Sequence, residues 1–127
     1  MAEPAAPAPP RRVEKPWGHE LWFAVTDRYA GKIIHINAGH ELSLQYHQRK
    51  DESIYLLSGE LELELDDEQG QLRTLRLEPG QCRRIEVGRR HRMRALAEVE
   101  LCEVSTPDLD DVVRLEDRYG RVAAPGE

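Results

Sequence analysis

The sequence lacks several features that would place it quickly in a class of protein. It has no apolar run long enough to span a bilayer, and no apolar segment near Met1 of the kind that a secretory signal requires. Its 2 cysteines, Cys82 and Cys102, are too few for a disulfide scaffold, so we expect two reduced thiols. Together these absences favour a cytoplasmic protein of bacterial type.

A surplus of positive charge is also missing. Lys and Arg number 18 against 24 Asp and Glu, which gives a formal net charge of -6 and a pI of about 5.4. A dedicated nucleic-acid binder usually presents a basic face, and recruitment to anionic membranes depends on similar charge. We therefore expect neither a nucleic acid nor a membrane as a partner.

The length of 127 residues predicts a single domain. Residues 1–12 are mainly Ala and Pro and end in two arginines, a composition that cannot build a core, so this segment is predicted to be a disordered arm. The domain is expected over residues 13–121, followed by a flexible tail at 122–127.

Short strands separated by turns are predicted along most of this domain. Leu61, Leu63 and Leu65 alternate with glutamates, which indicates a strand with one buried and one acidic face. Further strands are expected at 21–25, 33–37, 42–47, 52–57, 72–77, 81–87 and within 91–106. A helical period is absent before residue 108, and a short helix is expected at 109–119 with Asp108 as its N-cap. The pattern is typical of an all-β sandwich or barrel.

Four side chains carry metal-ligating chemistry. Gln45 and His47 are two apart on a predicted strand, so both leave the same face. A bend at 48–51 would bring Glu52 onto the neighbouring strand, and His91 opens a later one. Two imidazoles, one carboxylate and one amide oxygen form a mixed set that suits one divalent metal ion, with Zn as the first choice and Mn, Co, Ni or Fe as others.

The spacing of these residues resembles the two motifs of the cupin superfamily. The pattern Gly39-x5-Gln45-x-His47-x4-Glu52-x6-Gly59 is similar to the first motif, with Gln45 in place of its first histidine. The pattern Gly80-x7-Gly88-x2-His91 is similar to the second. The resemblance implies a jelly-roll-like β-barrel that holds the metal inside. It also implies a homodimer, for which the segment 15–23 is a suitable contact.

A closer resemblance covers about residues 13–121. The stretches KPWG at 15–18, LSLQYH at 42–47 and DDVVRLEDRYGR at 110–121 are similar to the C-terminal isomerase domain of type II phosphomannose isomerases. That family interconverts mannose 6-phosphate and fructose 6-phosphate with a divalent metal. The resemblance implies Gln45, His47, Glu52 and His91 as metal ligands. The nucleotidyltransferase domain fused to such domains is absent from these 127 residues, so guanylyl transfer is not expected.

The same resemblance implies residues that would contact the substrate, a small sugar or sugar phosphate. Lys32 and, in the basic tail, Arg114 or Arg121 would bind it. An aldose–ketose isomerase must also move a proton between adjacent carbons, which needs a general base. His40, Glu41 and Glu103 are candidates because they lie near the motifs.

We assign the predicted catalytic roles to Glu103 and Arg114. The other interpretation of Arg114 is a helix-surface residue paired with Asp110 or Asp117. The chain differs from the family pattern at Arg49, Lys50, Ile54 and Ala95. Two alternative functions therefore stay open: a metal-binding cupin with lyase or oxygenase activity, and a non-catalytic sugar-binding module.

Overall fold

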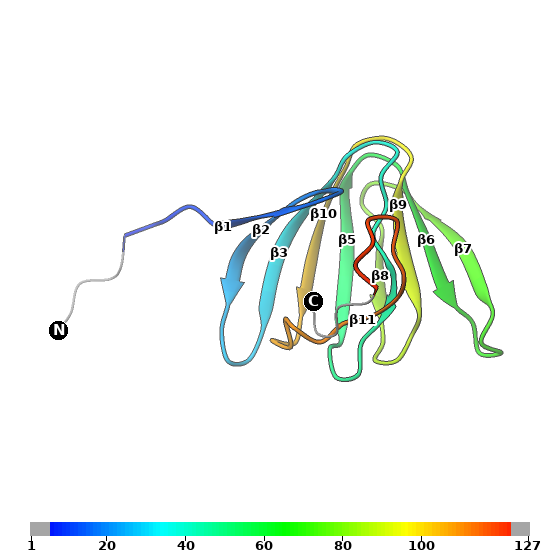
Figure 1. Ribbon diagram of the computed structural model, residues 1–127. Helices are drawn as coiled ribbons and strands as arrows, with labels where there is room; N and C mark the ends of the chain where they lie inside the picture. The colour runs from blue at the N-terminus through cyan, green and yellow to red at the C-terminus, as the bar shows by residue number, and fades with distance from the viewer. Residues whose placement is uncertain (1–5, 123–127) are drawn as a thin grey trace.

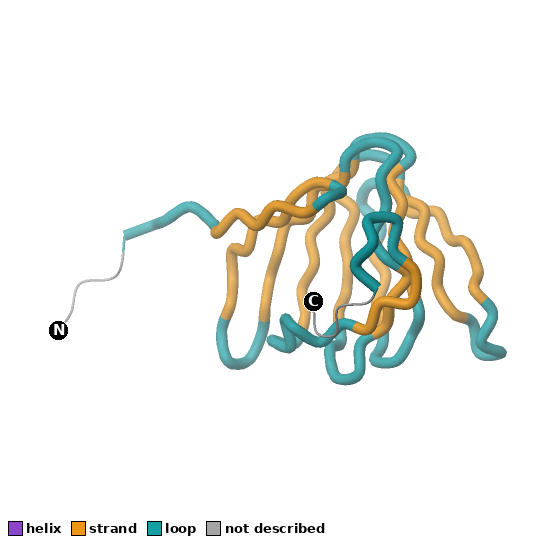
Figure 2. The backbone as a smooth tube through the Cα atoms, viewed as in Figure 1, coloured by secondary structure: helices purple, strands orange, loops and turns teal. Residues whose placement is uncertain are grey.

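A computed structural model describes residues 6–122, which form two antiparallel β-sheets (Figure 1). The strands are β1 (Arg11–Lys15), β2 (Gly18–Val25), β3 (Ala30–Ile36), β4 (Leu44–Tyr46), β5 (Glu52–Ser58), β6 (Leu61–Asp66), β7 (Leu72–Leu77), β8 (Cys82–Ile85), β9 (His91–Ala95), β10 (Val99–Ser105) and β11 (Val113–Glu116). Figure 2 shows only strands and loops in this part of the chain. The predicted all-β class is confirmed.

The chain passes repeatedly from one sheet to the other. The six-stranded sheet has the order β1-β2-β3-β10-β5-β8, and the five-stranded sheet has the order β11-β4-β9-β6-β7. Consecutive strands such as β4 and β5 therefore belong to different sheets, as in jelly-roll folds. In Figure 1, β1, β2 and β3 lie at the left and β6 and β7 at the right. This topology lets residues of β4, β5 and β9 meet between the sheets.

The core lies between the two sheets and follows the predicted alternation. Leu61, Leu63 and Leu65 on β6 are at most 2% exposed. Glu64 on the opposite face of the same strand pairs with Arg92 at 3.2 Å. Burying each of these leucines stabilises the fold by roughly 1.5–3 kcal/mol. β6 thus anchors β9, on which His91 lies directly across from Leu65.

The predicted helix at 109–119 is wrong. Residues Val113–Glu116 form β11, which pairs with β4 in the register Val113↔Tyr46 and Arg114↔Gln45. A β-branched valine favours a strand, and the open edge of β4 offers backbone partners that a surface helix would leave unused. Asp108 therefore has no helix to cap, and its carboxylate instead accepts a hydrogen bond from Thr106 Oγ1 at 2.8 Å. Because Arg114 lies in β11, the interpretation of this arginine as a helix-surface residue is wrong.

The two ends of the described chain differ in their contacts. Residues 6–10 extend away from the sheets, whereas Arg11 and Arg12, which were placed in the predicted arm, belong to β1. Residues 1–5 of that arm and 123–127 of the predicted tail lie outside the described residues. The division into arm, domain and tail stays a prediction. No helix in the range 6–122 could cross a membrane, and both cysteines are free thiols, as expected.

Candidate metal centre

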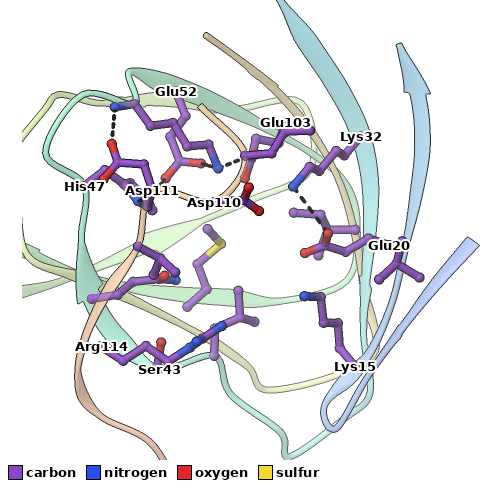
Figure 3. Close-up of a pocket in the computed structure, with 18 of the residues that line it drawn as sticks. Lys15, Glu20, Lys32, Ser43, His47, Glu52, Glu103, Asp110, Asp111 and Arg114 are labelled. Atoms are coloured by element: carbon purple, nitrogen blue, oxygen red, sulfur yellow. Dashed lines mark hydrogen bonds and ion pairs between the residues drawn. The ribbon is translucent and has the colours of Figure 1, made fainter. Parts of the chain in front are cut away.

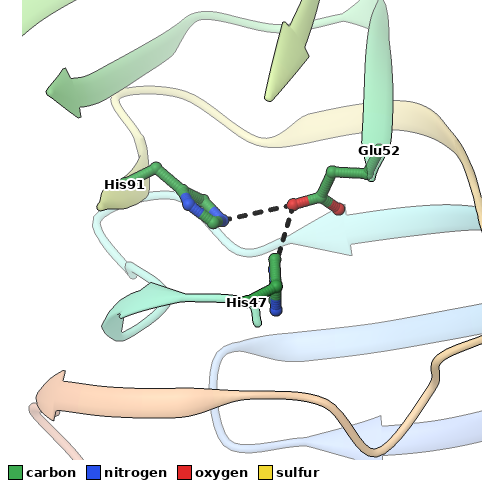
Figure 4. Close-up of side chains that lie close together, drawn as sticks. All are labelled: His47, Glu52 and His91. Atoms are coloured by element: carbon green, nitrogen blue, oxygen red, sulfur yellow. Dashed lines mark hydrogen bonds and ion pairs between the residues drawn. The ribbon is translucent and has the colours of Figure 1, made fainter. Parts of the chain in front are cut away.

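Three strands bring His47, Glu52 and His91 together. His47 follows the last residue of β4, Glu52 opens β5 and His91 opens β9, whose partner across the sheet is Gln45. All three side chains are buried, and their ligand atoms lie within 4.8 Å of one another. Figure 4 shows the two imidazoles directed at the Glu52 carboxylate. The pairing of β4 with β9 therefore joins the two predicted motifs in space.

The hydrogen bonds of the two imidazoles fix their tautomers. His47 Nδ1 lies 2.5 Å from the carbonyl oxygen of Asp111, and His91 Nδ1 lies 2.9 Å from that of Arg89. Because a carbonyl oxygen only accepts, each Nδ1 carries a proton, and Nε2 is the ring atom whose lone pair is available to a metal. This is the arrangement in which histidines bind metals through Nε2 while a backbone group orients the ring.

The donor atoms fit a divalent cation. Both Nε2 atoms lie 3.2 Å from Oε1 of Glu52. The Nε2 atom of His91 is buried and has no hydrogen-bond partner. Two ring nitrogens and a carboxylate oxygen thus converge in a buried space, where a cation among them would satisfy all three as ligands. The His47, Glu52 and His91 group can therefore hold a metal ion, and its mixed donor chemistry suits the predicted transition metals.

Gln45 lies beside this group, as the strand alternation predicts. It is half-buried on β4, opposite His91 on one side and Arg114 on the other, and it lines the same cavity as His47. An amide oxygen in this place is available to a metal. Its role as a fourth ligand stays a prediction.

A cavity of about 240 Å³ adjoins the group. The predicted substrate-contact residues Lys32, Arg114 and Arg121 all line it, and so does Glu103. Figure 3 shows Lys15 and Arg114 on the side away from Glu52. The cavity thus has an anionic and metal-binding part and a part with several cations.

Among the three candidate bases, the cavity contains Glu103 alone. His40 Nδ1 lies 2.7 Å from the hydroxyl of Tyr119, and Glu41 accepts a hydrogen bond from Arg94 at 2.9 Å. Neither residue is part of the cavity wall. Glu103 lies on β10 directly across from Lys32 of β3, and its side chain is only 5% exposed.

A buried lysine joins the two carboxylates of the site. Lys50 Nζ lies 3.0 Å from Glu103 Oε2 and 3.4 Å from Glu52 Oε2. Burial works against the charged ammonium, but the two glutamates raise the pKa of Lys50 above its ordinary value. Burial also opposes the charge of Glu52, but Lys50 holds the pKa of this carboxyl well below its usual range. Burial and the neighbouring Glu52 charge raise the pKa of Glu103 to about 7.

A second ion pair lies farther along the cavity. Lys32 Nζ is 3.4 Å from Glu20, which also accepts a hydrogen bond from Trp22 Nε1 at 2.8 Å. Burial opposes the charge of Glu20, but Lys32 lowers the pKa of this carboxyl. At Lys15, burial lowers the pKa, and the charges of nearby lysine and arginine side chains lower it further against the opposing effect of Glu20. Positive charge is thus concentrated in this part of the cavity.

Sequence reasoning missed several residues of the site. Lys50 was noted only as a difference from the family pattern, and Lys15 only as part of a motif. Glu20 could have been found, because it alternates with Trp22 on one strand and so shares its inward face. Asp111 was noted only as part of the stretch at 110–121, since its contacts with residues 47–50 depend on a pairing between distant strands.

Comparison with known proteins gives consistent matches over most of the chain. Residues 32–105 match the family model described as "Cupin domain". The xanthan biosynthesis protein XanB of Xanthomonas campestris pv. campestris is 34% identical over 116 residues, which cover 87% of this chain and 24% of that protein. The mannose-1-phosphate guanylyltransferase of Escherichia coli is 32% identical over 117 residues, covering 88% and 23%. The chain thus spans about a quarter of the length of the curated relatives it matches.

Solved structures show the same fold at lower identity. KdgF from Halomonas sp. superimposes with a TM-score of 0.66 at 22% identity, covering 76% of this chain and 86% of that one. Oxalate decarboxylase from Bacillus subtilis gives a TM-score of 0.74 at 17% identity, covering 84% of this chain and 30% of that one. These likenesses establish the arrangement of strands.

Proposed function

The chain belongs to the cupin family, and we propose that it is a metal-dependent aldose–ketose isomerase of the mannose-6-phosphate isomerase type, acting on a sugar or sugar phosphate. One observation carries the proposal. A buried His47, Glu52 and His91 group adjoins a cavity that also holds a carboxylate, Glu103, and several cationic side chains. This is the combination that proton transfer on an anionic sugar requires.

The relatives support this substrate class. The resemblance to cupins is confirmed, since residues 32–105 match the cupin family model. The matching relatives also include a mannose-1-phosphate guanylyltransferase. Other relatives are named for the biosynthesis of xanthan and alginate. Because the chain matches about a quarter of each, a role in mannose phosphate chemistry is carried over as a proposal.

The residues divide into three tasks. His47, Glu52 and His91, with Gln45, would hold the metal. When bound, a divalent ion polarises the oxygens of the substrate and stabilises the negative charge that develops during isomerisation. Glu103 would move the proton between the adjacent carbons, and Arg114 would stabilise negative charge on the substrate.

The cavity has the size and charge for a small anion. A volume of about 240 Å³ suits a ligand smaller than drug-sized molecules. Acidic and basic side chains in the cavity wall balance, with Lys15, Lys32, Lys50, Arg114 and Arg121 against Glu20, Glu52, Glu103, Asp110 and Asp111. A bound divalent cation would therefore leave the cavity with a surplus of positive charge, which favours a phosphate group.

The test is isomerisation of mannose 6-phosphate to fructose 6-phosphate by protein loaded separately with Zn, Mn, Co, Ni and Fe. We expect turnover with at least one metal and a loss of at least 100-fold in kcat in Glu103→Gln, following the usual contribution of a general base. Glu41→Gln is the matched control and should keep full activity. Absence of turnover with every metal would overturn the isomerase proposal. Sugar binding without turnover would then favour the binding-module alternative.

A further inference from the structure

We propose that Lys50 is a positioning residue of the metal centre. Its ammonium group holds Glu52 so that a single carboxylate oxygen faces the two histidines, and it holds Glu103 beside the same space. The part that concerns Glu52 rests on the metal site alone. The part that concerns Glu103 rests on the proposed isomerase function.

The backbone of Lys50 is fixed from outside the motif. The Asp111 carboxylate accepts hydrogen bonds from the amides of Gln48, Arg49 and Lys50 at 3.0, 2.6 and 2.8 Å. Three amides on one carboxylate leave the loop between β4 and β5 little freedom. Lys50 therefore enters the interior from a rigid backbone, whereas the neighbouring Arg49 side chain is 67% exposed.

The side chain of Lys50 ends between two carboxylates that are almost fully buried. The side chains of Lys50, Glu52 and Glu103 are 8%, 2% and 5% exposed. Unpaired charges of this kind are costly to bury, so the ammonium is required where it lies. Lys50 Nζ joins these two carboxylates, with Glu103 Oε2 at 3.0 Å and Glu52 Oε2 at 3.4 Å.

The two oxygens of Glu52 have different partners. Lys50 contacts Oε2, while Nε2 of His47 and of His91 both approach Oε1. With Oε2 engaged, Glu52 can offer only Oε1 to an ion between the histidines, which favours one bond to the metal over two. Removing the ammonium would free Oε2, allow the carboxylate to rotate and change the coordination of the bound ion.

The experiment uses Co²⁺ as the probe, because its visible absorption reports coordination. We compare the wild type with Lys50→Met, Lys50→Arg and the control Arg49→Met, which removes an exposed cation from the same loop. In Lys50→Met we expect Co²⁺ affinity to fall about tenfold and the absorption spectrum to change. Lys50→Arg should keep a spectrum close to that of the wild type, and Arg49→Met should match the wild type in both.

Lys50→Met leaves two buried carboxylates without a counter-charge and can fail to fold. The double variant Lys50→Met with Glu103→Leu removes one of those charges and supplies no new hydrogen-bond donor to Glu52. Wild-type Co²⁺ affinity and spectrum in either folded variant would overturn the proposal. Because the Co²⁺ readout needs no turnover, a failure of the isomerase assay would leave the result on Glu52 unaffected and would remove only the proposed function and the part that concerns Glu103.

Discussion

Asp111 and His47 are 64 positions apart in the sequence, yet the Asp111 carbonyl oxygen lies 2.5 Å from Nδ1 of His47. The carboxylate of the same aspartate accepts hydrogen bonds from the backbone amides of Gln48, Arg49 and Lys50, which follow His47. Burial opposes the charge of this carboxylate, but the hydrogen bonds lower the pKa of Asp111. One residue of the C-terminal segment thus orients a candidate ligand and fixes the loop that carries Lys50.

Asp111→Asn should weaken metal binding without removing any ligand. An amide oxygen cannot hold three backbone amides as strongly as a carboxylate, so the loop at 48–50 that follows His47 is held less firmly, although the backbone carbonyl at 111 still faces the ring. We expect metal affinity to fall about tenfold, as for other groups that orient metal ligands. The measurement is a Zn²⁺ titration against a competing chelator. Asp110→Asn is the control, and equal effects of the two changes would contradict this account.

His91→Ala should abolish stoichiometric metal binding and lower the melting temperature of protein purified with metal. It removes one of the converging Nε2 atoms and opens a space in a fully buried position. His19→Ala, on the outer face of β2, should leave metal content unchanged. Retention of one metal per chain in His91→Ala would refute the ligand assignment.

The first motif predicts the relative places of its own candidate ligands, because these residues are close together in the sequence. Their spacing places Gln45 and His47 on one predicted strand and Glu52, after a bend at 48–51, on the next. The contact of Lys50 with Glu103 is different, because it depends on the pairing of β5 with β10 in the register Ile54↔Glu103. No local pattern fixes a register between strands so far apart in sequence.

The C-terminal segment shows how local charge spacing can mislead. Asp117 and Arg121 are four apart, as in a helical ion pair, and they do pair at 2.8 Å. They do so in a turn, since β11 ends at Glu116. Pairing with β4 over Val113–Glu116 outweighs helical propensity there, because tertiary contacts commonly override it.

Lys15→Met should raise the KM for mannose 6-phosphate with little change in kcat. Lys15 lines the cavity in the region rich in positive charge, so its loss weakens binding of the phosphate and not the proton transfer. We expect about a tenfold increase, corresponding to one charged hydrogen bond. Steady-state kinetics measure this. Arg12→Met removes a charge from the exposed face of the same strand, and a similar KM increase in it would speak against a specific contact.

The homodimer, expected through the segment 15–23, stays a prediction, and we propose as its contact the outer face of the six-stranded sheet, which carries Leu21 of that segment. A row of side chains crosses it through the register pairs Leu21↔Ile33, Ile33↔Cys102, Cys102↔Tyr55 and Tyr55↔Cys82. A second copy packed face to face on this row would bury its apolar side chains.

Tyr55→Lys should therefore convert a dimer into a monomer of 14.6 kDa. Tyr55 is 45% exposed, and its replacement would place two lysines in the contact. Leu96→Lys is the control, because Leu96 is 43% exposed but lies in the turn between β9 and β10. Light scattering during gel filtration gives the mass. A monomeric wild type would contradict the expected dimer.

The metal content of the purified protein tests the central claim most directly. Elemental mass spectrometry after purification without chelators should find about one divalent transition metal per chain, held by His47, Glu52 and His91. Stripped protein should take up one equivalent of Zn, Mn, Co, Ni or Fe. A protein that contains no such ion and binds none of these five metals when they are added would contradict the account.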